Sequence, residues 1–316
     1  MQLQFTTLDV FTSTRYLGNP LAVIRVPSSL RTHLTEHQKQ KIAREFNYSE
    51  VTFLHEPAAA EDVADFDIFT PLSRMSFAGH PTIGTALYVA QHAGAYPGIK
   101  KLRTVAGVIP FEYDDVVKRA TVGIPHDVHV HQKRLAHPYA PATDLNKAIV
   151  PIVSIVKGMA FGLAQVADLE ALGAVAKPLV DPATRFNREH LDKGSGWDVG
   201  YTGTFYYVDL GFEEGSSEKE DDKGDDSGSV RRFRTRSIPI YEDPGTGSAS
   251  AALCCYIALT ERARGVNRFH LTQGVEMGRQ CDIFVSVRMR EDGEGVEEVK
   301  LSGTAVEVME GSLTVE

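Results

Sequence analysis

Apolar and polar residues alternate along much of the chain, which is the pattern of strands that bury only one face. The first such segment is 3–10, and similar segments, many rich in β-branched residues, recur along the sequence. We expect further strands at 21–24, 48–54, 66–70, 102–105, 108–113, 119–122, 204–210, 232–240, 283–287, 299–301, 305–308 and 312–315, the last two flanking a turn at Gly311. The pattern predicts an α+β protein with more strand than helix.

Helices are expected at four places between these strands. Thr35 followed by Gln38 is a capping-box pattern, and the apolar residues after it predict a helix that ends near Asn47. A short helix is expected from 168–172, beyond a bridging segment at 126–138. The last two helices are expected from apolar runs that each follow an unusual motif.

The two motifs read almost alike. Residues 80–86 are His-Pro-Thr-Ile-Gly-Thr-Ala, and residues 243–249 are Asp-Pro-Gly-Thr-Gly-Ser-Ala. We expect each proline at the first helical position, with His80 or Asp243 before it as the N-cap. The recurrence of one motif in both parts of the chain indicates an internal repeat, and hence two similar halves.

Backbone amides near the two predicted helix starts could bind an anion, because the N-terminal end of a helix favours negative charge. The amides concerned are those of 84–85 and 247–248. Two such ends facing one another would bind a carboxylate. The alternative is that His80 and Asp243 only cap buried helices, and each motif taken alone favours that alternative.

Composition and charge narrow the class of protein. The chain has 316 residues, 42% of them hydrophobic and 24% charged, as in soluble globular proteins of one large domain or two ordinary ones. The formal net charge is -9, and much of it comes from an acidic, Gly- and Ser-rich segment at 213–229, expected to be a mobile surface loop. Basic residues are scattered, so no nucleic-acid partner is expected. The most apolar stretch, 150–156, is too short to span a membrane.

Cysteine and histidine positions were considered as reactive or metal-binding groups. Cys254 and Cys255 are adjacent in a predicted helix, Cys281 lies apart, and no signal-like start is present, which favours a reducing, cytoplasmic setting. His129 and His131 share one face of a strand if that segment is extended, with His126 and Asp127 nearby. No thiol has a useful spacing, so an ordinary polar strand edge is favoured and no metal site is predicted.

Glu50 is the acid that most invites a catalytic interpretation. It follows a predicted helix and has apolar neighbours at Val51 and Phe53. A carboxyl group shielded from water has a raised pKa and can exchange protons near neutrality. An exposed strand residue is an equally good interpretation of the same pattern. The sequence contains no nucleophile elbow, P-loop or dinucleotide fingerprint.

Taken together, several short segments resemble the phenazine-biosynthesis PhzF-like isomerase family, which shares its fold with diaminopimelate epimerase. They extend over nearly the whole chain, and the set is specific although no single segment is. The segments are 9–11, 18–23, 43–50, 69–71, 77–81, 242–248 and 303–315.

The resemblance implies two pseudo-symmetric halves, each a curled β-sheet or barrel around a central helix, with the active site in the cleft between them. We therefore expect an N-terminal half at 1–130, completed by a C-terminal strand at 304–316, and a C-terminal half at 131–303. The resemblance also implies a homodimer and no cofactor.

Roles for single residues follow from the same resemblance. Glu50 matches the proton-shuttling glutamate, and His80 and Asp243 match residues that hold the substrate and assist proton transfer. The predicted substrate-binding residues are Asn19, Gly79, Gly245, Thr246, Gly247 and Ser248. Related epimerases use a pair of cysteines at the loop positions, whereas Cys254 and Cys255 fall inside the helix, which makes two-thiol racemisation an unsuitable mechanism here.

The sequence thus predicts a cofactor-independent isomerase that transfers a proton within a small carboxylate-bearing substrate, with Glu50 as acid and base. The alternatives are a one-carbon epimerase or racemase of a small acid, and a non-catalytic small-molecule-binding protein of the same family.

Overall fold

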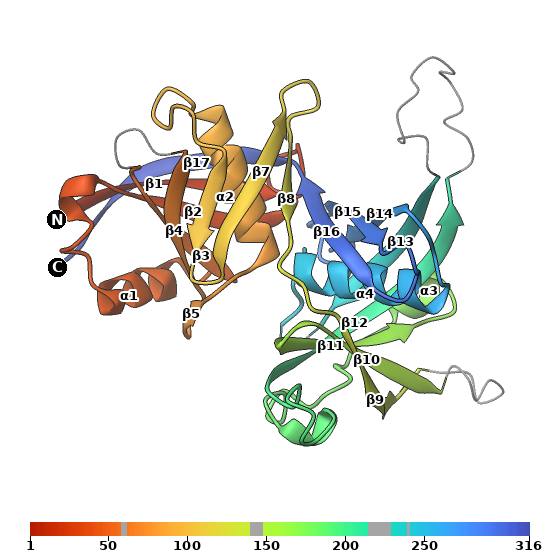
Figure 1. Cartoon of the computed structure of the whole chain (residues 1–316). Coiled ribbons are helices and arrows are strands. Elements are labelled where there is room, and N and C mark those ends of the chain that lie inside the picture. Colours follow the sequence, from red (N-terminus) through yellow and green to blue (C-terminus); the bar gives the residue numbers. More distant parts are fainter. Residues whose placement is uncertain (58–61, 140–147, 214–228, 239–240) are drawn as a thin grey trace, which may run out of the picture. The chain divides into compact units, whose positions relative to one another are not determined.

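The computed structural model describes residues 1–57, 62–139, 148–213, 229–238 and 241–316. The predicted acidic loop lies almost entirely outside these ranges, as does the end of the strand expected at 232–240. The chain divides into two compact units, Met1–Ile124 with Leu301–Glu316, and Pro125–Lys300 (Figure 1). None of the helices in the described ranges has the length and hydropathy that a membrane crossing requires.

The first unit consists of a curled sheet, a central helix and a second helix on the outside. The helices are α1 (Glu36–Phe46) and α2 (Gly79–Gln91), with a 3₁₀ turn η1 (Ser28–Leu30). The strands are β1 (Gln2–Val10), β2 (Asn19–Val26), β3 (Glu50–His55), β4 (Val63–Phe69), β5 (Arg74–Met75), β6 (Lys101–Thr104), β7 (Gly107–Asp114), β8 (Arg119–Gly123) and β17 (Ala305–Thr314).

The second unit has the same kind of construction. Its helices are α3 (Leu169–Gly173) and the central α4 (Gly247–Thr260), with a 3₁₀ turn η2 (Arg188–His190). Its strands are β9 (His129–Ala136), β10 (Ile149–Val156), β11 (Gly158–Gln165), β12 (Gly200–Phe212), β13 (Val230–Ser237), β14 (Val266–Gln273), β15 (Cys281–Met289) and β16 (Val296–Gly303), the last of which continues into the first unit.

Strand pairing is repeated between the units. In the first, β1 pairs antiparallel with β2, β2 parallel with β3, β3 antiparallel with β4, β4 parallel with β6, and β6 antiparallel with β7. In the second, β10 to β15 show the same series of antiparallel, parallel, antiparallel, parallel and antiparallel pairs. In each unit the central helix connects the second parallel pair of strands in the sequence: α2 comes between β4 and β6, and α4 between β13 and β14. The predicted α+β fold of two pseudo-symmetric halves is confirmed.

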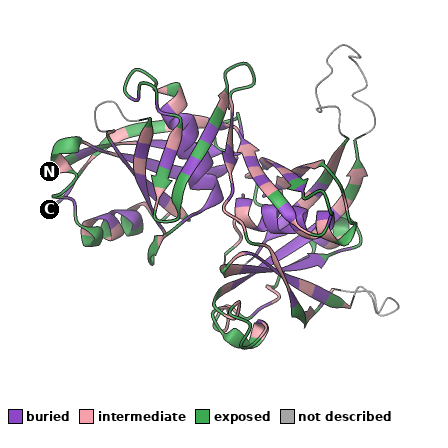
Figure 2. Ribbon diagram, viewed as in Figure 1, coloured by how far each residue is buried: buried purple, intermediate pink, exposed green. Residues whose placement is uncertain are grey.

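Each sheet curls around a helix that is apolar on nearly all sides. Every residue of α2 from Gly79 to Val89 is buried, and α4 is buried over most of its length (Figure 2). α2 packs on β1, β2, β3, β7, β8 and β17, whereas α4 packs on β10, β11, β14 and β15. A helix without a polar face is stable in water only when other elements surround it, so these two sequences require the curled sheets.

Several local predictions are confirmed. Thr35 and Gln38 form the capping box of α1, and Asn47 ends that helix in a left-handed conformation. Asp168 caps α3 by accepting a hydrogen bond from the amide of Ala171 at 2.8 Å. Most predicted strands overlap observed ones. No strand was predicted with bounds at β5, β10, β11 or β14, and β9 occupies the segment interpreted as a bridge.

The turn predicted at Gly311 is wrong. β17 runs without interruption through Gly311, which pairs with Phe5 of β1. A Cβ atom at Gly311 would lie 2.8 Å from the Phe5 ring. The glycine is therefore explained by a close cross-strand approach of an aromatic ring, not by a reversal of the chain.

The predicted helix starts are also wrong. α2 begins at Gly79 after the N-cap Ala78, which places His80 and Pro81 inside its first turn. α4 begins at Gly247 after the N-cap Thr246, so Asp243 precedes the helix. The amides of Gly84 and Thr85 belong to the helix interior and cannot receive an anion, whereas those of Gly247 and Ser248 lie in the first turn, as expected.

Gly84 tests how tightly α2 is enclosed. A Cβ atom there would lie 2.4 Å from Leu21 Cδ2 and 2.8 Å from Val10 Cγ2. Overpacking costs about 1–3 kcal/mol, whereas replacing a helical glycine by alanine gains about 1 kcal/mol. The difference is a net cost of about 0–2 kcal/mol, and two contacts this short favour the upper half of that range. We therefore expect Gly84→Ala to lower the free energy of unfolding by about 1–2 kcal/mol, measured by urea denaturation.

The matched control is Gly94→Ala, because no atom lies within 4 Å of a Cβ built at Gly94. This variant should change the free energy of unfolding by less than about 0.5 kcal/mol. A Gly84→Ala protein as stable as the wild type would show that α2 is not tightly packed against β1 and β2.

Candidate functional site

Asn19, Glu50 and His80 come together in the first unit. Asn19 begins β2 and Glu50 begins β3, and these strands pair in parallel with Leu21 opposite Glu50. His80 enters from the first turn of α2. Its Nδ1 atom lies 3.4 Å from Asn19 Nδ2 and 3.4 Å from Glu50 Oε2. Three elements distant in sequence thus place an amide, a carboxylate and an imidazole around one point.

The His80 imidazole is kept uncharged by its surroundings. Its side chain is 5% exposed, and burial lowers its pKa to about 3, with an opposing effect from the Pro20 backbone. At neutral pH the contact with Glu50 is therefore made by a neutral ring, not by an ion pair. Its Nε2 atom is buried and has no hydrogen-bond partner among the described residues.

Glu50 is neither sealed in the core nor fully open to water. Its side chain is 19% exposed, while the rest of β3 is buried. The interpretation of Glu50 as a merely exposed strand residue is therefore wrong. Ser49, immediately before it, donates a hydrogen bond to Asn19 Oδ1 at 3.4 Å, which ties β3 to the start of β2.

Asp243 belongs to a polar group in the second unit. The Thr246 hydroxyl donates to Asp243 Oδ2 at 2.5 Å. Gln273, the last residue of β14, donates from Nε2 to the Asp243 carbonyl at 2.7 Å and to Thr246 Oγ1 at 3.0 Å. Its Oε1 accepts from the Thr246 amide at 3.1 Å. Gln273 is completely buried, and it holds the chain in the orientation that precedes α4.

Gly245–Ser248 form the start of α4 and the loop before it. The amides of Gly247 and Ser248 have no carbonyl partner within the helix, because they belong to its first turn. They favour an anion by their dipoles. Burial, and secondly the charge of Asp243, raises the pKa of Tyr201 above its usual range, so this phenol remains protonated beside the aspartate.

The predicted site residues thus fall into two groups, one in each unit. Asn19, Glu50, Gly79 and His80 belong to the first, while Asp243 and 245–248 belong to the second. Sequence reasoning missed Ser49 and Gln273 as supporting residues. Gln273 had no signal of its own because the strand that carries it was not predicted.

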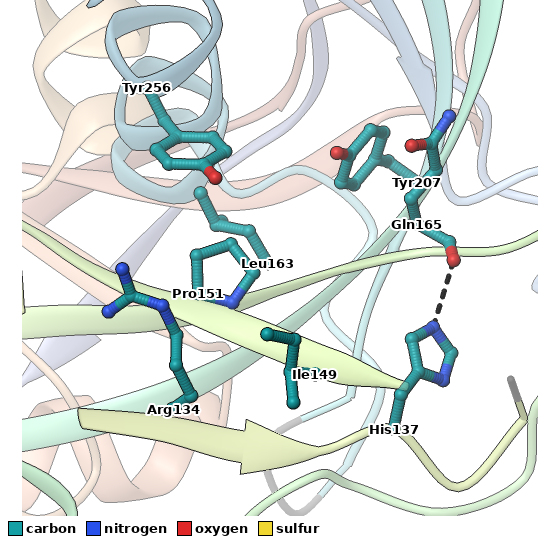
Figure 3. A pocket seen from close by; sticks show the side chains of 8 residues that line it. All are labelled: Arg134, His137, Ile149, Pro151, Leu163, Gln165, Tyr207 and Tyr256. Carbon is teal, nitrogen blue, oxygen red and sulfur yellow. Dashed lines mark hydrogen bonds between the residues drawn. The ribbon is translucent and has the colours of Figure 1, made fainter. Parts of the chain in front are cut away.

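A separate cavity of about 200 Å³ lies in the second unit (Figure 3). Its polar lining includes Arg134 and the hydroxyl-bearing rings of Tyr207 and Tyr256. His137 Nε2 is 2.9 Å from the Gln165 carbonyl at one side of the cavity. None of the predicted site residues lines this cavity.

His129 and His131 share one face of β9, as predicted, and their ring centroids are 4.7 Å apart. The acid beside them is Asp192, not Asp127 as considered from the sequence. Cys254, Cys255 and Cys281 are all buried, and burial raises the pKa of the Cys254 thiol well above its usual range. The cysteines of α4 are therefore poor nucleophiles, in agreement with the sequence analysis.

Comparison with known proteins identifies the family. The family model described as phenazine biosynthesis-like protein matches residues 8–173 and 216–311. An uncharacterized isomerase from Mesorhizobium japonicum is 29% identical, with 97% of each chain covered. The trans-2,3-dihydro-3-hydroxyanthranilate isomerase of Pseudomonas aeruginosa is 29% identical, with 98% of each covered.

The fold has counterparts among solved structures. A phenazine biosynthesis protein of the PhzF family from Bacillus anthracis covers 100% of both chains with a TM-score of 0.71 and 20% sequence identity. That identity supports the fold alone. With the family model covering most of the sequence, the resemblance read from the short segments is confirmed, and the chain belongs to the phenazine biosynthesis-like protein family, whose named relatives include isomerases.

Proposed function

We propose that this protein is a cofactor-independent isomerase that moves a proton between carbon atoms of a small carboxylate-bearing substrate, with Glu50 as acid and base. The observation that supports this most directly is the partly shielded Glu50 carboxyl group 3.4 Å from a neutral, buried His80. The isomerase names of relatives aligned over nearly the whole chain support the reaction class.

In the proposed reaction Glu50 takes a proton from a carbon next to an unsaturated system. The electron pair of that C–H bond moves into the conjugated system, the double bond shifts, and Glu50 returns the proton to another carbon. Substrate and product then have the same atoms and charge. A positioned acid–base group contributes about 10²–10⁴-fold to the rate, so fixed dipoles must supply the remainder.

A neutral His80 suits this role better than a charged one. A protonated imidazole beside Glu50 would stabilise the carboxylate and weaken it as a base. A neutral ring instead accepts a proton on one nitrogen while it donates from the other. We propose that Asn19, supported by Ser49, fixes the His80 ring, and that His80 assists the proton transfer.

The second group of residues is proposed to bind the carboxylate of a substrate. The first-turn amides of Gly247 and Ser248 would donate hydrogen bonds to this carboxylate, aided by the loop residues Gly245 and Thr246. Asp243 would orient the substrate, supported by its hydrogen bond from Thr246. Gly79, at the start of α2, would contribute its amide in the same way. The homodimer, the absence of a cofactor and the cytoplasmic location stay predictions from the family resemblance.

Replacement of Glu50 by Gln tests the proposal. The Glu50→Gln protein should lose at least about 10²-fold in deuterium incorporation from D₂O into the substrate, because the amide cannot take the proton. The probes are trans-2,3-dihydro-3-hydroxyanthranilate and a panel of small unsaturated and amino carboxylates, followed by mass spectrometry and NMR.

Glu56→Gln is the matched control, since Glu56 follows the same strand and its carboxyl group accepts a hydrogen bond from the Ser28 amide, not from a predicted site residue. It should exchange deuterium as the wild type does. Equal exchange by Glu50→Gln and wild type would contradict the role of Glu50. Binding of a probe to the wild type without any exchange across the panel would favour a non-catalytic binding protein, and label retained at a single inverted carbon would favour an epimerase.

The buried His80 also predicts how stability depends on pH. Histidine in an unfolded chain has a pKa of about 6.5, whereas that of His80 in the folded protein is about 3. Below pH 6.5 the unfolded state therefore binds a proton that the folded state does not, and stability falls by at most about 1.4 kcal/mol per pH unit. His80→Asn should show a shallower loss of unfolding free energy than the wild type between pH 6.5 and about 4.

NMR of the ¹⁵N-labelled histidine rings provides an independent check. The His80 ring, assigned by comparison with His80→Asn, should retain the shifts of a neutral imidazole at pH 5. A midpoint near 6.5 for this ring would show that burial does not keep His80 uncharged.

A further inference from the structure

Two histidines and an aspartate in the second unit converge at a place that the proposed reaction does not use. β9 supplies His129 and His131, and Asp192 follows η2. Asp192 Oδ2 lies 3.3 Å from His129 Nε2 and 3.6 Å from His131 Nδ1. One possible ligand atom from each residue lies within 4.8 Å of the others.

These separations are close to those of a tetrahedral metal site. Nitrogen and oxygen ligands about 2.0–2.1 Å from a zinc ion lie roughly 3.3–3.5 Å from one another. The two separations that involve Asp192 therefore need only small adjustments, whereas the His129 and His131 ligand atoms, which lie within 4.8 Å of one another, would have to move closer when an ion binds. Two imidazoles and one carboxylate are a usual set for zinc and neighbouring divalent metals.

Hydrogen bonds outside the group hold the ligand atoms in position. His131 Nε2 is 2.9 Å from the hydroxyl of Ser154, a buried neighbour. The backbone amide of Asp192 donates to His131 Nδ1 at 3.3 Å, so Nδ1 is the unprotonated nitrogen and Nε2 donates to Ser154. A metal-bound histidine needs this arrangement, with one lone pair free for the metal and the other nitrogen donating. The long amide contact is the one that a metal ion would replace.

The carboxylate and the outer imidazole are also fixed. Asp192 accepts hydrogen bonds from the amides of Gln132 at 2.8 Å and Lys133 at 3.0 Å. Trp197 stacks on His129 with a centroid distance of 4.8 Å and an interplanar angle of 8°. The rings of His129 and Trp197 therefore lie parallel, and the His129 Nε2 edge is directed at Asp192.

We propose that His129, His131 and Asp192 form a binding site for a divalent transition metal of the zinc type, with water in the fourth position. The bound ion would join the segment that follows η2 to β9. The alternative is an ion pair between His129 and Asp192, with the Asp192 amide as the partner of His131 Nδ1. Metal titration distinguishes the two, because only the proposed site takes up a stoichiometric ion.

Trp197 makes the site observable, because it is the only tryptophan of the chain and stacks on a proposed ligand. Chelator-treated full-length protein would be titrated with Co²⁺ while tryptophan fluorescence and visible absorption are recorded. We expect saturable quenching at one equivalent, an absorption band typical of a four-coordinate Co²⁺ ion, and loss of that band when Zn²⁺ is added.

Three variants assign the ligands. His129→Ala and Asp192→Asn should each weaken Zn²⁺ affinity by at least tenfold, and Ser154→Ala, which removes an outer hydrogen bond, by about tenfold. His270→Ala is the matched control. His270 Nε2 lies 2.9 Å from Asp282 Oδ1, a similar His–Asp contact, but among the described residues this pair is not part of a cluster of three possible metal ligands. It should bind Zn²⁺ as the wild type does, and circular dichroism would verify that all four variants fold.

Either of two results would overturn the proposal. One is the absence of saturable quenching by Co²⁺ up to millimolar concentrations in the wild type. The other is a set of folded His129→Ala and Asp192→Asn proteins that bind Zn²⁺ as tightly as the wild type. The melting temperature gives a second readout, since Zn²⁺ should raise it in the wild type and in His270→Ala but not in His129→Ala.

Discussion

Enclosure of an apolar helix by a curled sheet is the constraint on which the first unit depends. α2 is buried from Gly79 to Val89, so its first turn is dehydrated together with its middle. The same enclosure that stabilises the helix therefore removes water from His80 and keeps the ring neutral. β2 and β3 begin beside that turn, and their first residues, Asn19 and Glu50, reach the imidazole. The packing of α2 and the lowered pKa of His80 thus both result from the burial of this helix.

Burial of His80 has a cost that the fold must offset elsewhere. A buried polar atom without a hydrogen bond destabilises a protein by about 1–3 kcal/mol, and His80 Nε2 is such an atom among the described residues. In the second unit the polar residues before α4 have hydrogen-bond partners, because Gln273 hydrogen-bonds to both Asp243 and Thr246. Buried polar side-chain atoms without a partner also occur elsewhere in the described residues, for example at Thr202 and Thr235, so this cost does not by itself mark a functional site.

The sequence predicted features whose signals are local, and missed those that depend on distant residues. The capping box at Thr35 and the alternation of most strands are local, so they were found. The helix starts were misplaced because every amide of a first helical turn lacks a partner, so a proline such as Pro81 fits at several positions there. Gly311 was mistaken for a turn because Phe5, which explains it, is far away in sequence. Asp192 and Gln273 were missed for the same reason. Glu50 was noticed for its apolar neighbours and His80 for its repeated motif, and the family resemblance assigned the two to one site.

β17 belongs to the first unit although the whole of the second unit precedes it in the chain. It pairs with β1 over the full length of that strand, from Gln2 opposite Thr314 to Val10 opposite Ala305. On the ribosome, the segment 125–300 is therefore synthesised before the first sheet has its β17 edge. Until β17 is synthesised, the edge of β1 that pairs with it stays unpaired. An exposed strand edge of this kind is prone to aggregation, which chaperones prevent. Folding during synthesis thus favours completion of the second unit first, opposite to the usual order of domains.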